Sequence, residues 1–310
     1  MRILHQIRKE LAAMIAAAAP DVELIAVPAD GELAAEIRAE VLVVYPWASA
    51  NIAALLERGV KWVHAIGTGV DAFPLRLITT QTLTCSRGAS AIPISEWTLA
   101  VMLAFEKHLP EVWIHAAPER KRNLGVALGG LHGKALGLVG IGGIGTAVAE
   151  RALPFGMHVR GFRRSGAPAE IAGVEVVRSL HELVAASDHI VIAAPATAAT
   201  RHMFDRDAFA AVKPGVHLVN IARGSLIDQE ALRAALDDGR VAMASLDAVE
   251  PEPLPAEHWM YTHPRVRLSP HISWSMPGAA ELLIEPFLEN LRRYRRGEAL
   301  LGVVDVAAGY

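Results

Sequence analysis

The stretch KALGLVGIGGIGTAVAERALPFGMHVRGFRRSG, residues 134–166, decides how the second half of this chain is expected to fold. A short apolar run ends at Gly140 and is followed by an Ala-rich segment with helical spacing. Residues 140–145 fit the pattern G-x-G-x-x-G, in which glycines allow a tight strand-to-helix turn and a close approach of backbone to a phosphate. The helix N-terminus then offers free N–H groups to a pyrophosphate. The predicted cofactor-binding residues of this loop are Gly140, Gly142, Gly143, Ile144 and Gly145.

The end of the same stretch bears on which dinucleotide is bound. About twenty residues after the first glycine, an acidic side chain commonly binds the ribose hydroxyls of NAD. Here Arg163 occupies that place and is followed by Arg164 and Ser165. Two guanidinium groups and a hydroxyl suit a dianionic 2′-phosphate, which a carboxylate would repel. The sequence therefore favours NADP(H) as the cofactor, with NAD(H) possible.

Short apolar runs rich in Val, Ile and Leu alternate with Ala-rich helical segments along the whole chain. Continuous apolar strands are typical of parallel sheets that helices cover on both faces. The predicted fold class is therefore α/β, with two Rossmann-like, doubly wound parallel-sheet domains. Strands are predicted at 22–27, 41–45, 62–66, 135–140, 157–162, 189–195, 216–222, 241–247 and 266–270. Helices are predicted at 32–39, 51–59, 94–107, 144–153, 179–186, 228–238 and 279–297, and a strand and a helix are predicted before Pro20.

Composition limits the classes of function. The 310 residues are 52% hydrophobic and 20% charged, with a formal net charge of −3, which is typical of a soluble globular protein and gives no electrostatic basis for binding nucleic acid. The single cysteine, Cys85, excludes an intrachain disulfide. No run of about eighteen apolar residues predicts a membrane span. Lys9 and Glu10 interrupt the apolar N-terminal stretch, so no secretory leader is expected and the protein is expected to be cytoplasmic.

Three charged residues follow consecutive predicted strands near the C-terminus. Arg223 lies in NIARGSLID, Glu252 in LDAVEPEPLP and His271 in LSPHISW. Ligands of open α/β sheets bind at the carboxyl ends of the strands, so these side chains are expected to gather at one edge. Hydride addition to a carbonyl places negative charge on one oxygen, which requires a cation and a proton donor together. These residues are the predicted catalytic groups.

The order of GIGGIG, NIARGSLID, PEPLP and SPHISW resembles the D-isomer-specific 2-hydroxyacid dehydrogenases, most nearly the glyoxylate/hydroxypyruvate reductases. Upstream, AIGTGVD (65–71) and SAIPISEWTLAVML (90–103) match the substrate-domain segments of that family, so the resemblance covers nearly the whole chain. It implies reduction of a small 2-oxo acid to the D-2-hydroxy acid with NADPH. Arg223 would bind the 2-oxo acid and stabilise the developing alkoxide, and His271 would donate the proton. Glu252 would orient His271 and stabilise its imidazolium form.

The resemblance also implies an organisation of the chain. Residues 1–103 and 276–310 would form a discontinuous substrate-binding domain and residues 104–275 a dinucleotide-binding Rossmann domain, with the active site in the cleft between them. A homodimer through the cofactor domains is implied, to which the loop 108–130 is expected to contribute. The sequence departs from the family pattern at Ser90, Pro93 and Trp97, and at residues 196–197, whereas the three catalytic positions match it.

Further binding residues are implied by the resemblance alone. The backbone of Thr68 and Gly69 would receive the substrate carboxylate. The residues expected along the cofactor and near its nicotinamide amide are Pro195, Thr200, Ile221, Ala222 and Asp247. No metal site is predicted.

The identity of the substrate is the most open point of the sequence. Tyr45, Trp47 and Trp274 are expected to form an aromatic wall, which suits a small substituent as in the glyoxylate/hydroxypyruvate reductases or an aromatic 2-oxo acid such as phenylpyruvate. No basic cluster lies near them in the sequence, which disfavours a phosphorylated substrate. The alternative class is a nucleotide-binding regulator, because the family also contains a transcriptional corepressor. No interaction motif favours it here.

Overall fold

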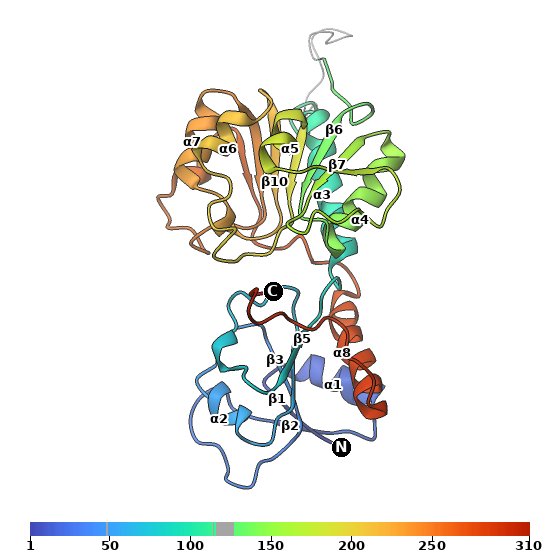
Figure 1. Ribbon diagram of the computed structural model, residues 1–310. Helices are drawn as coiled ribbons and strands as arrows, with labels where there is room; N and C mark the ends of the chain where they lie inside the picture. Colours follow the sequence, from blue (N-terminus) through green and yellow to red (C-terminus); the bar gives the residue numbers. More distant parts are fainter. Residues whose placement is uncertain (48, 114, 116–126) are drawn as a thin grey trace. The chain divides into compact units, whose positions relative to one another are not determined.

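The chain divides into two compact α/β units in a computed structural model that describes residues 1–47, 49–113, 115 and 127–310. Unit 1 comprises Met1–Ser90, Pro195–Thr197 and Met276–Tyr310, and unit 2 comprises Ala91–Ala194 and Ala198–Ser275. Each unit contains one parallel sheet with helices on it (Figure 1). The predicted fold class, α/β with two parallel-sheet domains, is confirmed. Part of the loop 108–130, expected to contribute to a dimer, lies outside the described residues.

Unit 1 is built on a five-stranded sheet in the order β2-β1-β3-β4-β5. Its strands are β1 (Arg2–His5), β2 (Glu23–Ala26), β3 (Val41–Val44), β4 (Trp62–Ala65) and β5 (Thr82–Cys85). Its helices are α1 (Lys9–Ala18), α2 (Ile52–Leu56), the 3-10 helix η1 (Leu75–Leu77) and α8 (Ala279–Arg296).

Successive residues of the unit 1 strands pack against different helices, as the two-residue period of a strand requires. Ile3 and Val41 belong to a buried apolar cluster with Ile15 of α1 and Phe287 of α8. The next residues, such as Leu42, belong to a second cluster with the buried residues of α2. The sheet is therefore covered on both faces, which explains why its strands read as continuous apolar runs.

The helix predicted at 32–39 is wrong. The segment is irregular, and the Nη1 atom of Arg38 donates to the carbonyls of Ala35 and Ile37 at 2.9 and 2.8 Å. Arg58 donates to the same Ala35 carbonyl at 2.9 Å. These guanidinium groups bind carbonyl oxygens of the segment in the absence of a helical ladder. Leu33 and Ile37 pack on the apolar cluster that contains Leu42, and they do so from an irregular backbone.

Unit 2 is built on a seven-stranded sheet in the order β12-β11-β10-β9-β6-β7-β8. Its strands are β6 (Ala135–Val139), β7 (His158–Phe162), β8 (Val174–Val176), β9 (His189–Ile192), β10 (Val216–Asn220), β11 (Val241–Leu246) and β12 (Val266–Leu268). Its α-helices are α3 (Ala91–Glu106), α4 (Gly143–Ala152), α5 (Leu180–Ala186), α6 (Arg206–Ala211) and α7 (Gln229–Asp237). Its 3-10 helices are η2 (Leu153–Phe155), η3 (Gly224–Leu226) and η4 (Trp259–Tyr261).

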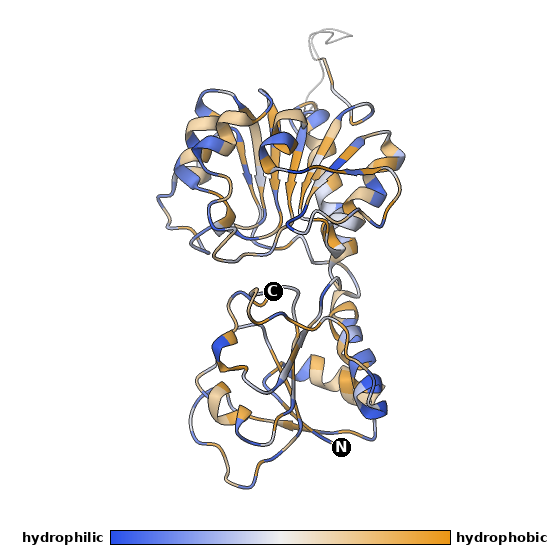
Figure 2. Ribbon diagram, viewed as in Figure 1, coloured by the Kyte–Doolittle hydropathy of each residue, from blue (hydrophilic) through white to orange (hydrophobic). Residues whose placement is uncertain are grey.

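The helices of unit 2 form two groups, because α3 packs on α4, whereas α5, α6 and α7 pack in sequence (Figure 1). Since parallel crossovers are right-handed, the reversal of strand order between β9 and β6 directs these groups to opposite faces of the sheet. Apolar residues are concentrated on the strands (Figure 2). The reversal of strand order marks the edge position where a dinucleotide binds in such folds.

The compact units divide at Ser90, before α3, whereas the expected boundary at residue 103 falls inside that helix. The reason is the packing of α3. Its residues Ile94 and Met102 join the apolar cluster of β6 and α4. At its last residue, the buried carboxylate of Glu106 lies 2.9 Å from Nε2 of His189 on β9 and 2.5 Å from Nζ of Lys134. These contacts hold the whole helix to unit 2.

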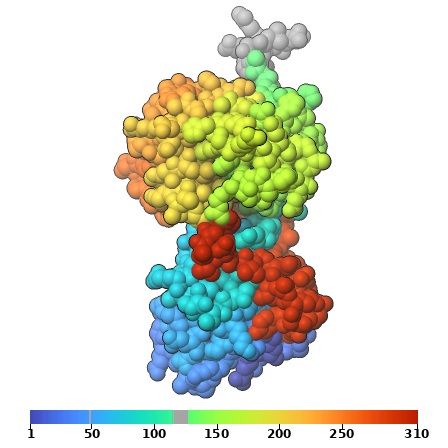
Figure 3. Space-filling model, in the orientation of Figure 1, coloured from blue at the N-terminus to red at the C-terminus, as the bar shows by residue number. Residues whose placement is uncertain are grey.

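The C-terminal segment belongs to unit 1. Asn290 of α8 is fully buried and bonds the backbone of Leu301 through both ends of its amide, at 2.7 and 2.8 Å. The N–H of Val304 then donates to the carbonyl of Leu83 on β5. Figure 3 shows the C-terminal part of the chain, in red, against the blue and cyan surface of the first ninety positions. Among the described residues, no helix is long and apolar enough to span a membrane.

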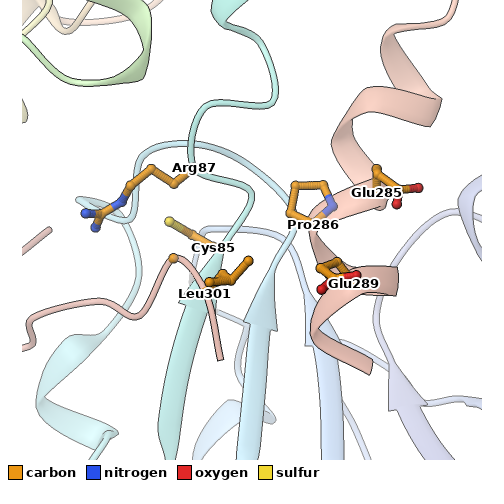
Figure 4. Close-up of a pocket in the computed structure, with 7 residues that line it drawn as sticks. Cys85, Arg87, Glu285, Pro286, Glu289 and Leu301 are labelled. Carbon is orange, nitrogen blue, oxygen red and sulfur yellow. The ribbon is translucent and has the colours of Figure 1, made fainter. Parts of the chain in front are cut away.

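A cavity of about 320 Å³ lies in unit 1 beneath the C-terminal segment (Figure 4). It is lined by Cys85, Arg87, Glu285, Pro286, Glu289, Leu301 and Gly302. None of these residues belongs to the predicted site, and burial raises the pKa of the Cys85 thiol, which keeps it protonated. The carboxylates of Glu285 and Glu289 both pair with the guanidinium of Arg292. The cavity therefore offers no free charged group from these two residues.

Lowering the pH from 7 to 5 is expected to destabilise unit 1 through His64. Its ring nitrogens lie 2.8 Å from Oγ1 of Thr84 and 3.2 Å from Oγ of Ser86, and burial lowers its pKa from 6.5 to about 3. The folded imidazole stays neutral, whereas the unfolded one gains a proton below pH 6.5, so stability is lost as the pH falls toward 3. At pH 5 the loss is about 2 kcal/mol. Urea unfolding of wild type and His64→Gln at both pH values checks this, and an equal loss in both proteins would contradict it.

Candidate active site

The glycine loop after β6 has the geometry that a pyrophosphate requires. Gly140 has φ +100°, and a Cβ there would lie 2.8 Å from the carbonyl oxygen of Ala193 after β9. A Cβ on Gly145 would lie 2.2 Å from the carbonyl oxygen of Gly140. In contrast, nothing lies within 4 Å of a Cβ on Gly142. Two glycines are therefore required by close backbone packing, and the third opens onto free space.

This free space lies at the start of α4. Gly142 is the N-cap of α4, and no side chain caps the helix. Its first N–H groups, with the positive end of the helix dipole, are thus available to an anion. The residues present fit a dinucleotide: Gly142, Gly143 and Ile144 would hold the pyrophosphate. Among the described residues no group of three or more His, Cys, Asp or Glu could hold a metal ion.

The two arginines lie directly after β7, beside the glycine loop. The N–H of Gly140 donates to the carbonyl of Phe162, so the loop adjoins the end of β7. Arg163 is half-buried and its Nη1 lies 3.3 Å from the carbonyl of Pro168, while Arg164 and Ser165 are exposed. This is the strand end where the adenosine ribose lies in such folds.

The predicted catalytic residues follow three adjacent strands. The register pairs Asn220 of β10 with Leu246 of β11, and Leu246 with Leu268 of β12. Arg223, Glu252 and His271 are carried by the segments that follow these strands. The gathering expected from sequence therefore has its basis in a shared sheet edge within unit 2.

His271 and Glu252 are in direct contact. Nδ1 of His271 lies 3.0 Å from Oε1 and 3.1 Å from Oε2 of Glu252, and both side chains are a little over one-third exposed. Because Nδ1 faces the carboxylate, Nε2 is the nitrogen turned away from it. His271 also has φ +51°, a conformation that is uncommon outside glycine and tends to occur at functional positions.

Asp247 holds the loop that carries His271. Its Oδ1 accepts from Oγ of Ser269 at 2.5 Å and from the N–H of Ile272 at 2.9 Å, and Oδ2 accepts from the N–H of Ser273 at 2.9 Å. The side chain is only 2% exposed. These bonds give Asp247 a structural role that the sequence did not reveal, and its predicted approach to the nicotinamide amide stays a prediction.

Asn220 shapes the turn that presents Arg223 and was missed in the sequence. Its amide nitrogen donates to the carbonyls of Arg223 and Ala248 at 2.9 and 3.2 Å, and its oxygen accepts from the N–H of Ala222 at 3.1 Å. The side chain is fully buried. A polar residue at the end of the mostly apolar strand VHLVN was the available signal.

Arg223 itself is half-buried, and its Nη1 donates to the carbonyl of Ala222 at 2.7 Å. The next position, 224, requires glycine, because a Cβ there would lie 2.0 Å from the backbone of Val249. The turn therefore packs tightly on the segment after β11. Trp274 lies on the neighbouring loop and donates from Nε1 to the carbonyl of His271 at 2.9 Å.

The remaining predicted residues divide between the units. Tyr45 follows β3, and Thr68 and Gly69 follow β4 in unit 1, both of the latter half-buried. Pro195 also belongs to unit 1. In unit 2, Thr200 and the buried Ile221 lie in the segments after β9 and β10. The roles of these residues stay predictions.

Comparison with known proteins agrees with this geometry. Residues 99–273 match the family model described as D-isomer specific 2-hydroxyacid dehydrogenase, NAD binding domain. The chain belongs to the D-isomer specific 2-hydroxyacid dehydrogenases. The family resemblance identified in the sequence is confirmed. The match spans unit 2 from within α3 to the residue before Trp274.

Individual relatives of this dehydrogenase family member carry different substrate names. A D-3-phosphoglycerate dehydrogenase of Methanocaldococcus jannaschii is 34% identical over 254 residues, 79% of this chain and 48% of the relative. A glyoxylate reductase of Thermococcus kodakarensis is 40% identical over 169 residues, 54% of this chain and 50% of the relative. This chain thus spans about half the length of these two relatives.

A solved structure matches over the full length. It is the NADPH-dependent glyoxylate/hydroxypyruvate reductase of Sinorhizobium meliloti in complex with NADP and sulfate, with 26% identity and a TM-score of 0.82. The match covers 100% of this chain and 99% of that one.

Proposed function

We propose that this chain reduces a small 2-oxo acid to the D-2-hydroxy acid, with NADPH preferred over NADH. The observation that carries the proposal is the contact of Nδ1 of His271 with both carboxylate oxygens of Glu252, on strand ends that adjoin the one bearing Arg223. An imidazole that a carboxylate orients through one ring nitrogen is suited to deliver a proton from the other. The family model and the names of the relatives support the reaction class.

The residues divide the chemistry between them. Gly142, Gly143 and Ile144 would hold the dinucleotide, whose nicotinamide would supply a hydride to the carbonyl carbon. The carbonyl oxygen then gains negative charge, which the guanidinium of Arg223 stabilises. His271 donates a proton from Nε2 to that oxygen, and Glu252 stabilises the imidazolium before transfer. The balance is one hydride and one proton added to the carbonyl, which gives a secondary alcohol.

The substrate class is proposed to be glyoxylate and hydroxypyruvate. The names of the glyoxylate reductase relative and of the matching solved structure support it. The stacked rings of Tyr45 and Trp47, with centroids 4.6 Å apart, provide a compact apolar surface suited to a small substituent. The phosphoglycerate dehydrogenase relative supports a phosphorylated alternative, which the same experiment tests.

The experiment is a comparison of initial rates with NADPH and NADH against glyoxylate, hydroxypyruvate, pyruvate, phenylpyruvate and 3-phosphohydroxypyruvate. The proposal expects turnover of glyoxylate and hydroxypyruvate, faster with NADPH. Fast turnover of phenylpyruvate or the phosphorylated compound alone would overturn the substrate class. No turnover of any 2-oxo acid, despite tight NADPH binding, would favour a nucleotide-binding regulator.

Replacing Arg163 by Asp together with Arg164 by Ala is expected to lower kcat/KM for NADPH by about 100-fold or more, with little change for NADH. Each charge-assisted bond to a 2′-phosphate contributes about 1.5–3 kcal/mol, and the new carboxylate would repel the phosphate. The ratio of kcat/KM for the two cofactors measures the effect. Arg178→Ala, an exposed arginine of the same unit, is the matched control. An unchanged ratio in the double variant would exclude a 2′-phosphate site at these residues.

A further inference from the structure

The segments that follow β1, β3 and β4 meet at one edge of the unit 1 sheet. Strand order reverses between β1 and β3, and open α/β sheets bind ligands outside the carboxyl ends of the strands at such a reversal. Tyr45 directly follows β3, and Arg8 follows β1. A Cβ on Gly67, after β4, would lie 2.7 Å from Cγ of Pro46. The segment bearing Tyr45 therefore touches the one that carries Thr68.

Tyr45 presents a hydroxyl whose bonding is set by one neighbour. Both the backbone N–H and the Nε–H of Arg8 donate to the Tyr45 oxygen, each at 3.2 Å. A phenol oxygen has two lone pairs and one hydrogen. With both lone pairs occupied, the hydrogen is the group that Tyr45 offers to a ligand. Its ring is fixed by stacking on Trp47 at an interplanar angle of 7°.

The surroundings of this hydroxyl are suited to a small organic ligand. Trp47 is 55% exposed although it is a large apolar side chain, and Arg8 is exposed as well. No basic cluster adjoins these aromatics in the sequence, and Arg8 is 37 positions away from Tyr45 in the chain. The structure adds one guanidinium to the aromatic pair, and its Nε–H is already used by Tyr45.

We propose that Tyr45, oriented by Arg8, donates a hydrogen bond to the oxygen on C3 of the substrate and thereby selects 3-hydroxy-2-oxo acids over their alkyl analogues. The inference rests on the proposed function and on the family resemblance, which implies that the backbone of Thr68 and Gly69 receives the carboxylate. Hydroxypyruvate carries a C3 hydroxyl, pyruvate carries a methyl group, and glyoxylate has no C3. A methyl group would leave the phenolic donor without a partner, which disfavours pyruvate. Arg8 is a positioning residue.

The test measures kcat/KM with NADPH for hydroxypyruvate, pyruvate and 3-phosphohydroxypyruvate in wild type, Tyr45→Phe and Arg8→Met. Tyr45→Phe keeps the stacked ring and removes only the hydroxyl. It is expected to lower kcat/KM for hydroxypyruvate by about five- to tenfold, the effect of one hydrogen bond, and that for pyruvate less than twofold. Arg8→Met removes the Nε–H that orients the phenol, so it is expected to lower the hydroxypyruvate-to-pyruvate ratio of kcat/KM in the same direction as Tyr45→Phe. A purely structural role of Arg8 would lower kcat/KM for both substrates alike.

Two matched controls accompany these variants. Tyr294→Phe removes another phenolic hydroxyl of unit 1, which bonds Glu40, and Arg2→Met removes another exposed guanidinium, which pairs with Glu23. Neither is expected to change the hydroxypyruvate-to-pyruvate ratio. An equal fall on both substrates in Tyr45→Phe, or an unchanged ratio, overturns this inference and leaves the proposed function standing. The inference about Tyr45 is also overturned if wild type prefers 3-phosphohydroxypyruvate and Arg8→Met loses that preference. Absence of turnover of every 2-oxo acid in wild type overturns both.

Discussion

Replacing His271 by asparagine is expected to lower kcat by about 10²–10⁴-fold, the usual contribution of a positioned proton donor. The variant loses the imidazole that faces Glu252, so no group remains to protonate the alkoxide. Asparagine is preferred to alanine because His271 has φ +51°, and asparagine tolerates the left-handed conformation much better than other non-glycine residues. The loop should therefore keep its backbone, which Asp247 holds through the N–H groups of Ile272 and Ser273.

The measurement combines kcat with the Kd for NADPH, which is expected to stay within about twofold of wild type because the glycine loop lies on another strand end. His202→Asn is the matched control, since the exposed His202 has φ +50° in the same unit. It should keep wild-type activity. Loss of NADPH binding in His271→Asn would show that the histidine is structural, and retention of full kcat would remove it from catalysis altogether.

The fold class could be predicted because its signals are local. Continuous apolar runs identify buried parallel strands, and the glycine pattern fixes one strand–turn–helix unit by itself. The error at 32–39 shows where this reasoning stops. That segment has helix-forming residues, but its carbonyls bind Arg38 and Arg58, and no propensity scale contains those contacts. The strand β5 was not predicted either, because TLTC alternates polar and apolar residues over only four positions.

The charged residues proposed for the site could be selected from the sequence, whereas the residues that hold their segments in place could not. Arg223, Glu252 and His271 follow consecutive strands, so sequence order alone placed them at one edge. Asn220 and Asp247 hold the backbone of two of these segments. Their function depends on hydrogen bonds between segments that sequence separates, such as Asn220 to Ala248. The Arg8–Tyr45 contact is non-local for the same reason: it requires β1 and β3 to be neighbours in the sheet.

Replacing Arg223 by alanine is expected to lower kcat/KM for the 2-oxo acid by about 10²–10³-fold or more, the effect of removing a donor that stabilises a developing oxyanion. Arg223 has φ −145°, so alanine fits the backbone without strain. Asn220 should still hold the turn, because it bonds the carbonyl and not the side chain of Arg223. Arg223→Lys should recover only part of the activity, since an ammonium lacks the planar fork that binds a carbonyl and a carboxylate oxygen together.

Added guanidinium ion distinguishes a direct role of Arg223 from a structural one. If the guanidinium group itself stabilises the alkoxide, millimolar guanidinium should restore part of the activity of Arg223→Ala and none of that of His271→Asn. Arg206→Ala, an exposed arginine at the start of α6, is the control for general charge effects and should behave as wild type. The direct role of Arg223 would be contradicted if Arg223→Ala keeps kcat/KM within about tenfold of wild type and guanidinium does not raise it. This conclusion requires that the variant keeps its melting temperature and its Kd for NADPH. The oxyanion would then have to be stabilised by His271 alone, and the loss in His271→Asn should approach the upper end of its expected range.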